Sequence, residues 1–188
     1  MGTASFWKTT IAYSKKVATT GALFETSKHV VAALAQPVDK KQKQVIIEFG
    51  AGHGNVTKGI LERMNPDSIL LSFELHKEFC DVLAQNISDP RLHLINDSAG
   101  ELKKYLQQYQ LTNADVIISA IPLTILPTTL RQQILTESHQ CLNSGGIWKQ
   151  VLYSTRATKW LRTTFGNVKY KILLLNMPPA CIYTCEKK

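Results

Sequence analysis

The sequence predicts an α/β fold in which a parallel sheet carries helices on both faces and ends in an antiparallel β-hairpin. Apolar, strand-like runs alternate with helical patterns five times between residues 44 and 165, as expected of consecutive βα units. Two final β runs, 168–175 and 180–185, are separated by four residues. They must pair antiparallel, because a parallel return needs a crossover of a dozen residues or more.

The chain begins with a predicted helix over 3–18. Its apolar face carries Phe6, Tyr13 and Val17, with three lysines on the opposite side. An aromatic-rich apolar face opposite lysines is typical of a helix that lies in a membrane interface. The same face is also suited to packing on the domain, so both interpretations stay open.

A second predicted helix starts at Thr26 or Ser27, either of which can cap it, and ends before Pro37. A short lysine-rich linker follows. We therefore divide the 188-residue chain into an N-terminal amphipathic, basic helical segment, 1–43, and a main domain, 44–188. The first segment is expected to act as a lid over lipid and substrate.

The main domain contains five predicted strands and five predicted helices. The strands are placed at 44–49, 68–74, 91–96, 113–119 and 146–153, and the helices at 55–64, 76–86, 98–109, 127–142 and 156–165. Turn-forming residues such as Pro66-Asp67 and Asp89-Pro90 separate them. Ligands of open α/β sheets bind where the parallel strands end, so the functional residues should follow the strands.

Charge is distributed unevenly along the chain. Residues 1–43 hold seven lysines and two acids, a net charge of +5, and residues 156–188 hold seven bases and one acid, a net charge of +6. The middle is slightly acidic. Basic ends predict an anionic partner, either a lipid surface or nucleic acid. The four cysteines form no Cys-x-x-Cys pair and the histidines are scattered, so we expect free thiols and no metal.

The first strand of the main domain runs into a glycine-rich loop. Glu48 is followed by Gly50, Gly52 and Gly54 at alternate positions. The last glycine comes one residue too early for a dinucleotide fingerprint, and no Gly-Lys-Ser/Thr follows, so NAD-type and P-loop sites are excluded. An acid two residues before Gly-x-Gly-x-Gly resembles the first motif of class I S-adenosyl-L-methionine (SAM) methyltransferases. That resemblance implies a Rossmann-like class I methyltransferase fold.

Polar residues also end the next three strands. Glu74 can accept both ribose hydroxyls, Asp97 and Ser98 can face the adenine amino group, and Ser119 ends the fourth strand. Singly, each of the first three could instead cap a helix. Their joint order along the chain favours a SAM site. The predicted cofactor residues are Glu48, Gly50, Gly52, Gly54, Glu74, Asp97, Ser98 and Ser119.

Three motifs resemble the bacterial phospholipid N-methyltransferase family. The stretch from Ser119 to Leu123 is similar to its Ser-x-x-Pro-Leu element, 145–153 to its Gly-Gly…Gln…Tyr strand, and 176–183 to its Asn-x-Pro-Pro-Ala-x-x-Tyr hairpin. The resemblance implies methyl transfer from SAM to the amine of phosphatidylethanolamine or its methylated derivatives. A more distant similarity is to rRNA adenine dimethyltransferases, whose Asn-x-Pro-aromatic element differs here.

For methyl transfer to an amine, we assign hypothetical roles to individual residues. Ser119 and the carbonyls of the 119–122 loop, including Pro122, would hold the acceptor nitrogen. Tyr183 and Tyr13, with Tyr153 beside the substrate, would contact a methylated cationic product, although any of them could simply be a packing residue.

Its partners follow from the same reading. We expect an anionic membrane surface and a phospholipid substrate, a monomer, and a cytoplasmic protein peripherally associated with the inner face of the membrane. RNA, and a catalytically silent SAM-binding module, remain alternatives.

Overall fold

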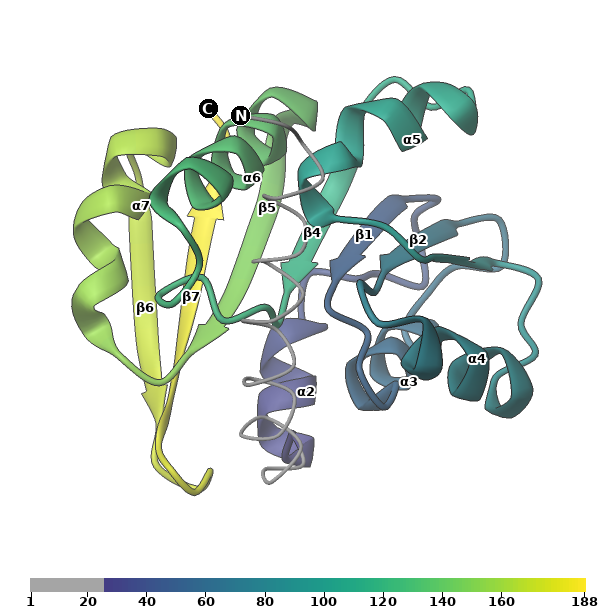
Figure 1. Ribbon diagram of the computed structural model, residues 1–188, viewed down its shortest axis with the longest axis horizontal. Coiled ribbons are helices and arrows are strands. Elements are labelled where there is room, and N and C mark those ends of the chain that lie inside the picture. The colour runs from purple at the N-terminus through teal and green to yellow at the C-terminus, as the bar shows by residue number, and fades with distance from the viewer. Residues whose placement is uncertain (1–25) are drawn as a thin grey trace.

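The computed structural model describes residues 26–188 and contains one seven-stranded sheet in the order β3-β2-β1-β4-β5-β7-β6 (Figure 1). β1 to β5 pair in parallel, whereas β7 lies antiparallel between β5 and β6. The expected parallel sheet with a terminal antiparallel hairpin is therefore confirmed. The strands are β1 (Val45–Phe49), β2 (Ile69–Phe73), β3 (Leu92–Ile95), β4 (Ala114–Ser119), β5 (Leu142–Leu152), β6 (Val168–Leu173) and β7 (Ala180–Glu186).

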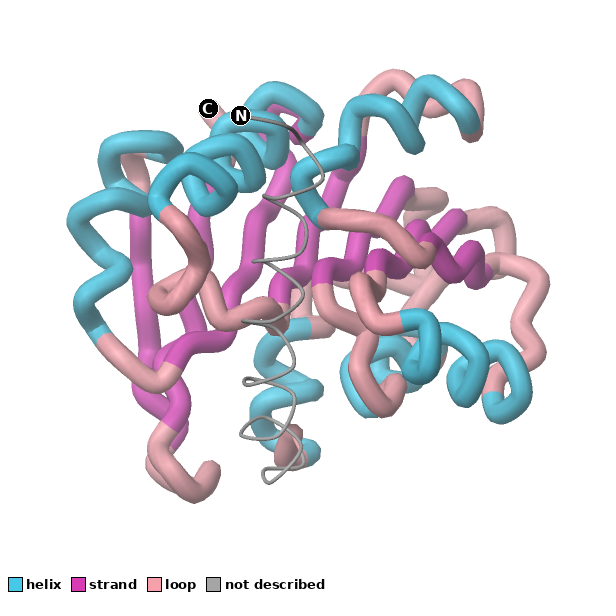
Figure 2. Tube along the Cα trace, in the orientation of Figure 1, coloured by secondary structure: helices cyan, strands magenta, loops and turns pink. Residues whose placement is uncertain are grey.

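Helices cover both faces of the sheet, as expected (Figure 2). Buried residues of α5, α6 and α7 join one apolar core, and those of α2 and α3 join the core on the other face. The α-helices are α2 (Lys28–Leu34), α3 (Asn55–Leu61), α4 (Lys77–Asn86), α5 (Leu102–Gln108), α6 (Thr128–Cys141) and α7 (Thr158–Phe165). Short 3-10 turns, η1 (Ala99–Glu101) and η2 (Thr155–Ala157), precede α5 and α7.

The segment before the first strand is partly built into the domain. Ser27 caps α2, because its hydroxyl accepts the N–H of Val30 at 3.4 Å. Val30, Leu34 and Val38 are buried in the same core as Ile46. Residues 26–43 therefore pack on the same core as the main domain. The predicted helix 3–18, with Tyr13, lies outside the described residues.

The fifth strand begins earlier than predicted. It was placed at 146–153, but β5 begins at Leu142 and includes Gly145-Gly146. The pairing of β5 with β4 shifts between Ala114 and Val116, as a β-bulge does. Gly145, with a φ of +75°, donates its N–H to Lys187 O at 2.6 Å. The glycines permit the bulge, and the C-terminal end of the chain pairs with it.

The directions of the strands place three loops on one side. β5 and β6 both run antiparallel to β7, so β6 is parallel to β1, β4 and β5. We call the side where these strands end the carboxyl edge; the arrowheads of β4 and β6 point to it in Figure 1. The glycine loop, the loop after Ser119 and the β6–β7 turn all leave from this edge. Within residues 26–188, none of the helices has the length and apolarity that crossing a membrane requires.

Candidate cofactor and acceptor site

The glycine loop is held against the neighbouring strand by backbone hydrogen bonds. Gly50 N–H donates to Phe73 O at 2.8 Å, and Ala51 N–H to the same oxygen at 3.3 Å. Gly50 has a φ of +83°, which side-chain-bearing residues rarely adopt. A Cβ on Gly50 would also lie 2.9 Å from Ile121 Cγ2. The loop therefore packs directly against the segment that follows Ser119.

The other two glycines differ in what surrounds them. A Cβ on Gly54 would clash with Leu83 Cδ2, so this glycine lets α3 begin against α4. A Cβ on Gly52 would meet no atom within 4 Å, although its φ of +51° is also positive. The side of the loop at Gly52 is thus open, as close approach of a ligand requires.

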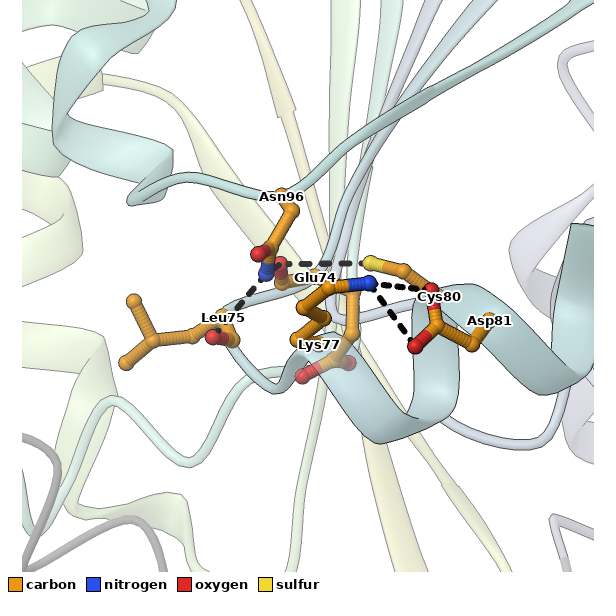
Figure 3. A network of polar contacts seen from close by, with 6 residues as sticks. All are labelled: Glu74, Leu75, Lys77, Cys80, Asp81 and Asn96. Carbon is orange, nitrogen blue, oxygen red and sulfur yellow. Dashed lines mark hydrogen bonds and ion pairs between the residues drawn. The ribbon is translucent and has the colours of Figure 1, made fainter.

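Glu74 joins the ends of β1 and β2. Its Oε2 accepts the N–H of Gly52 at 3.0 Å, and its Oε1 accepts the N–H of His76 at 2.9 Å. Only 7% of the residue is exposed. Asn96 spans the backbone at this point and donates to the carbonyls of Glu74 and Leu75 at 2.9 and 3.1 Å (Figure 3). The carboxylate is therefore fixed in place, with lone pairs left for further donors.

Glu48 is fully buried beneath the start of α3. Its Oε2 accepts hydrogen bonds from Thr57 Oγ1 at 2.8 Å and Ser72 Oγ at 2.6 Å, while Oε1 has no partner. Burial raises the pKa of Glu48 to about 7, against the lowering effect of the two hydroxyl bonds. A buried acceptor without a partner at the base of the loop suits a polar ligand, because unpaired buried polar atoms are costly.

Asp97 is anchored by three donors. Its Oδ1 accepts Ser98 N–H at 2.8 Å, and its Oδ2 accepts Lys104 Nζ at 3.0 Å and Tyr105 OH at 2.9 Å. Burial would raise the pKa of Asp97, but these hydrogen bonds outweigh it and lower the pKa below its usual range. The hydroxyl of Ser98 accepts Gly100 N–H at 3.1 Å and so caps η1, which is the alternative role that the sequence left open.

Ser119 and Gln150 form a pair of buried polar residues on adjacent strands. They are register partners where β4 and β5 approach the carboxyl edge, and both are fully buried. Gln150 Nε2 donates to Ile121 O at 2.8 Å and Val151 O at 2.7 Å. Ser119 Oγ and Gln150 Oε1 have no partner in the described chain. Two uncompensated oxygens thus lie next to the loop that contacts Gly50.

Gln150 was not among the predicted site residues, although it lies within one of the quoted motifs. The available signal was weak: Gln150 is polar within a predicted strand, but it directly follows another polar residue, Lys149. Thr57 and Ser72, the partners of Glu48, were also missed, because a buried hydroxyl on a helix or strand has no distinct sequence pattern.

The three remaining predicted residues are placed differently. Tyr183 is fully buried in β7, and its hydroxyl donates to Ser154 O at 2.9 Å; this geometry is that of a packing residue, the alternative noted for it. Tyr153 is half-exposed directly after β5. Pro122 lies in the loop after Ser119, where its carbonyl accepts Ile125 N–H at 3.1 Å.

The predicted residues at the ends of β1, β2 and β4 are therefore brought together. Ala120 N–H donates to Phe49 O at 2.8 Å, so Ser119 and the glycine loop share one edge. Within residues 26–188 no three His, Cys, Asp or Glu side chains gather as a metal ion would need; the absence of a metal stays a prediction.

Solved methyltransferases share this fold. The precorrin-6y C5,15-methyltransferase of Geobacter metallireducens matches with a TM-score of 0.66 and 15% identity, over 88% of this chain and 96% of that one. A Streptococcus mutans methyltransferase in complex with S-adenosylhomocysteine (SAH) matches with a TM-score of 0.57 and 18% identity, over 83% and 94%. SAH is SAM without its methyl group. The open side of Gly52, the fixed Glu74 carboxylate and the free Glu48 oxygen fit the same ligand, and the cofactor is SAM.

Sequence comparison finds relatives whose names refer to two different substrates. The ornithine lipid N-methyltransferase of Singulisphaera acidiphila is 26% identical over 145 residues, 76% of each chain. The ribosomal RNA adenine dimethylase family matches residues 14–166, most of the chain. The family shown is therefore the one to which the sequence has the more distant similarity, and the ornithine lipid relative supports a link to lipid methyltransferases. By its fold, its glycine loop and this match, the chain is a SAM-dependent methyltransferase that belongs to the ribosomal RNA adenine dimethylase family.

Proposed function

We propose that the protein is an N-methyltransferase that transfers the methyl group of SAM to a lipid amine, phosphatidylethanolamine or its methylated derivatives. The observation that carries the proposal is the pair of buried, unpartnered oxygens of Ser119 and Gln150 beside the glycine loop. A primary amine has N–H groups that such oxygens accept, and it keeps a lone pair for the reaction.

Ser119 and Gln150 would position the nitrogen. SAM supplies an already activated methyl group, so alignment within about 3 to 3.5 Å is the main requirement on the protein. Gln150 donates its amide N–H groups to Ile121 O and Val151 O. These bonds orient its oxygen and also hold the 119–122 loop in place. Ser119 Oγ accepts a second N–H.

Burial would also bring the amine to its reactive form. A lipid amine arrives as an ammonium, and both positioning residues are fully buried. Desolvation favours the neutral amine over the ammonium, so the ammonium would release its proton to water before the amine is buried. Glu48 of β1 and Glu74, which follows β2, accept hydrogen bonds from their own neighbours.

Two features support a lipid over a nucleobase. The curated relative that matches over three quarters of the chain is named for an ornithine lipid. At the acceptor loop, the aliphatic Leu123 is fully buried, and an aromatic side chain that could stack on a base is absent from 119–123. Adenine in RNA is the second candidate, because the matching family is named for rRNA adenine.

The test is a methyl-transfer assay with labelled SAM and three acceptors presented separately: phosphatidylethanolamine vesicles, ornithine-lipid vesicles and an rRNA transcript. We expect label in the phosphatidylethanolamine fraction. Label in ornithine lipid alone would correct the headgroup, and label in RNA alone would refute the proposal.

The matched pair of variants is Ser119→Ala and Asp81→Asn. Asp81 lies on the exposed face of α4, paired with Lys77. S119A should lower the transfer, whereas D81N should match the unmodified protein. SAM binding without transfer to any amine would instead indicate the silent module.

A further inference from the structure

The turn between β6 and β7 exposes an apolar tip. Leu174, Leu175 and Met177 are 77%, 78% and 86% exposed, the largest values among the exposed large hydrophobic residues of the described chain. Between them, Asn176 is buried, and its Nδ2 donates to Pro178 O at 2.7 Å. The tip is therefore a defined turn that presents three aliphatic side chains to solvent, which is a feature of interaction sites.

This tip projects from the carboxyl edge. β6 runs parallel to β4 and β5, so its C-terminal end points the same way as theirs, and the turn extends beyond the sheet at the bottom of Figure 1. Ser119 and the glycine loop lie at the same edge. Any surface that binds the tip therefore faces the edge of the sheet where Ser119 and the glycine loop lie.

The strand leading to the tip is basic on one face. Lys169 and Lys171 of β6 are exposed. Lys149 of β5 and Lys169 both pair with Thr184 of β7, so the three lysines share a face of the sheet. Burial lowers the pKa of Lys149, and the charge of Lys171 lowers it further. The acid of β7, Glu186, lies at the end of the strand away from the tip, and there is no acid between 156 and 185, so Lys169 and Lys171 give the strand beside the tip a positive charge.

We propose that the 174–177 tip inserts into the headgroup boundary of an anionic lipid bilayer while Lys169 and Lys171 contact its headgroups. Aliphatic side chains beside lysines match the apolar interior and the anionic surface of such a membrane. The 174–177 tip and the two prolines after it have no aromatic ring to stack on a base, which favours a bilayer over RNA. The role of this docking rests on the proposed function, because binding through the tip would bring the methyl-transfer site to its lipid substrate.

The direct test is co-sedimentation of the full chain with vesicles of phosphatidylethanolamine and phosphatidylglycerol. Transfer of one leucine out of water changes partitioning by about tenfold or more. The double variant Leu174→Ser with Leu175→Ser should therefore bind about 100-fold more weakly. Val82→Ser is the control, because Val82 is 46% exposed on α4, away from the tip.

A second variant tests the charge. Lys169→Gln with Lys171→Gln should weaken binding at low salt and reduce its dependence on ionic strength, because each lysine contributes through the anionic surface. Vesicles of phosphatidylcholine alone should bind less. Vesicle binding that is equal in the wild type and both double variants would overturn the proposal, as would loss of RNA binding in the leucine variant with vesicle binding unchanged.

Failure of the docking can be told apart from failure of the proposed function. Phosphatidylethanolamine in detergent micelles reaches the site without a bilayer, so the leucine variant should methylate it at the wild-type rate. If neither protein methylates it while vesicle binding still depends on the tip, the proposed acceptor is wrong and the docking stands. If both methylate it and the tip does not affect vesicle binding, the docking is wrong and the acceptor stands.

Discussion

The carboxylate of Glu74 accepts the backbone N–H of Gly52 at 3.0 Å. This hydrogen bond connects the two strand ends from which a SAM site is built, across 22 positions of sequence. The same carboxylate holds the N–H of His76, so it supports the loop and the start of α4 as well as any ligand. A change at Glu74 should therefore act on binding through two routes.

Glu74→Ala should weaken SAM binding by about 10- to 100-fold, the effect of losing one or two hydrogen bonds to a charged group. Glu74→Gln should weaken it less, because the amide keeps one acceptor oxygen for Gly52. Calorimetric titration with SAM measures both. Asp81→Asn, on the exposed side of the same region, should bind SAM normally. Unchanged affinity in E74A would remove Glu74 from the cofactor site.

Ser119→Ala should separate stability from activity. The hydroxyl is buried and has no hydrogen-bond partner, so its removal should leave the free energy of unfolding unchanged or raise it. Loss of an acceptor for the substrate amine should lower kcat/KM about tenfold or more. Urea unfolding and the labelled-methyl assay measure the two quantities. Destabilisation with normal transfer would mean that Ser119 is structural.

Gln150→Leu should behave differently from S119A. It removes the two donors that satisfy Ile121 O and Val151 O. Leaving buried carbonyls unpaired costs about 1 to 3 kcal/mol, so both the free energy of unfolding and the transfer rate should fall. SAM affinity should stay near the wild-type value, since Gln150 contacts the acceptor loop. A selective loss of SAM affinity would contradict this assignment.

Glu48 should make the stability of the protein dependent on pH. Its pKa is raised from 4.5 to about 7 in the folded state by burial. Between these values the folded state holds a proton that the unfolded state has lost, so stability falls as pH rises through this window and is level above it. The contribution between pH 5 and pH 8 is about 2 to 3 kcal/mol.

Glu48→Gln removes this titration while keeping an oxygen for Thr57 and Ser72. The free energy of unfolding of E48Q minus that of the wild type should therefore be larger at pH 8 than at pH 5, by the same amount of about 2 to 3 kcal/mol. Urea unfolding at the two pH values measures the difference, in which the other titrating groups cancel. Parallel stability curves for the two proteins would show that Glu48 is already ionised across this range.

Gly54→Ala and Gly52→Ala should separate packing from binding. At Gly54 the φ of +83° and the clash with Leu83 should together lower stability by about 2 to 4 kcal/mol. At Gly52 there is no clash, so only the positive φ costs, about 1 to 2 kcal/mol. The methyl group of G52A should nevertheless obstruct SAM. Urea unfolding and SAM titration should rank the variants in opposite orders.

Several features could be derived from the sequence because they depend on neighbouring residues. The alternation of strands and helices predicts the parallel sheet, and the short connection before Ala180 predicts the antiparallel hairpin. The spacing of Gly50, Gly52 and Gly54 after Glu48 predicts SAM, because a tight loop that approaches a ligand has a fixed local geometry. The half-exposed position of Tyr153 and the fully buried position of Tyr183 have no such local signal.

Pairings between distant segments were decided by the tertiary structure alone. Gln150 becomes a site residue because the register of β4 and β5 sets it beside Ser119, and Gly145-Gly146 becomes a bulge because the chain after β7 pairs with it. Because β7 lies antiparallel between β5 and β6, the 174–177 tip leaves the sheet at the carboxyl edge, where the site also lies. Local patterns specify which elements form; hydrogen bonding and burial between strands decide which side chains meet.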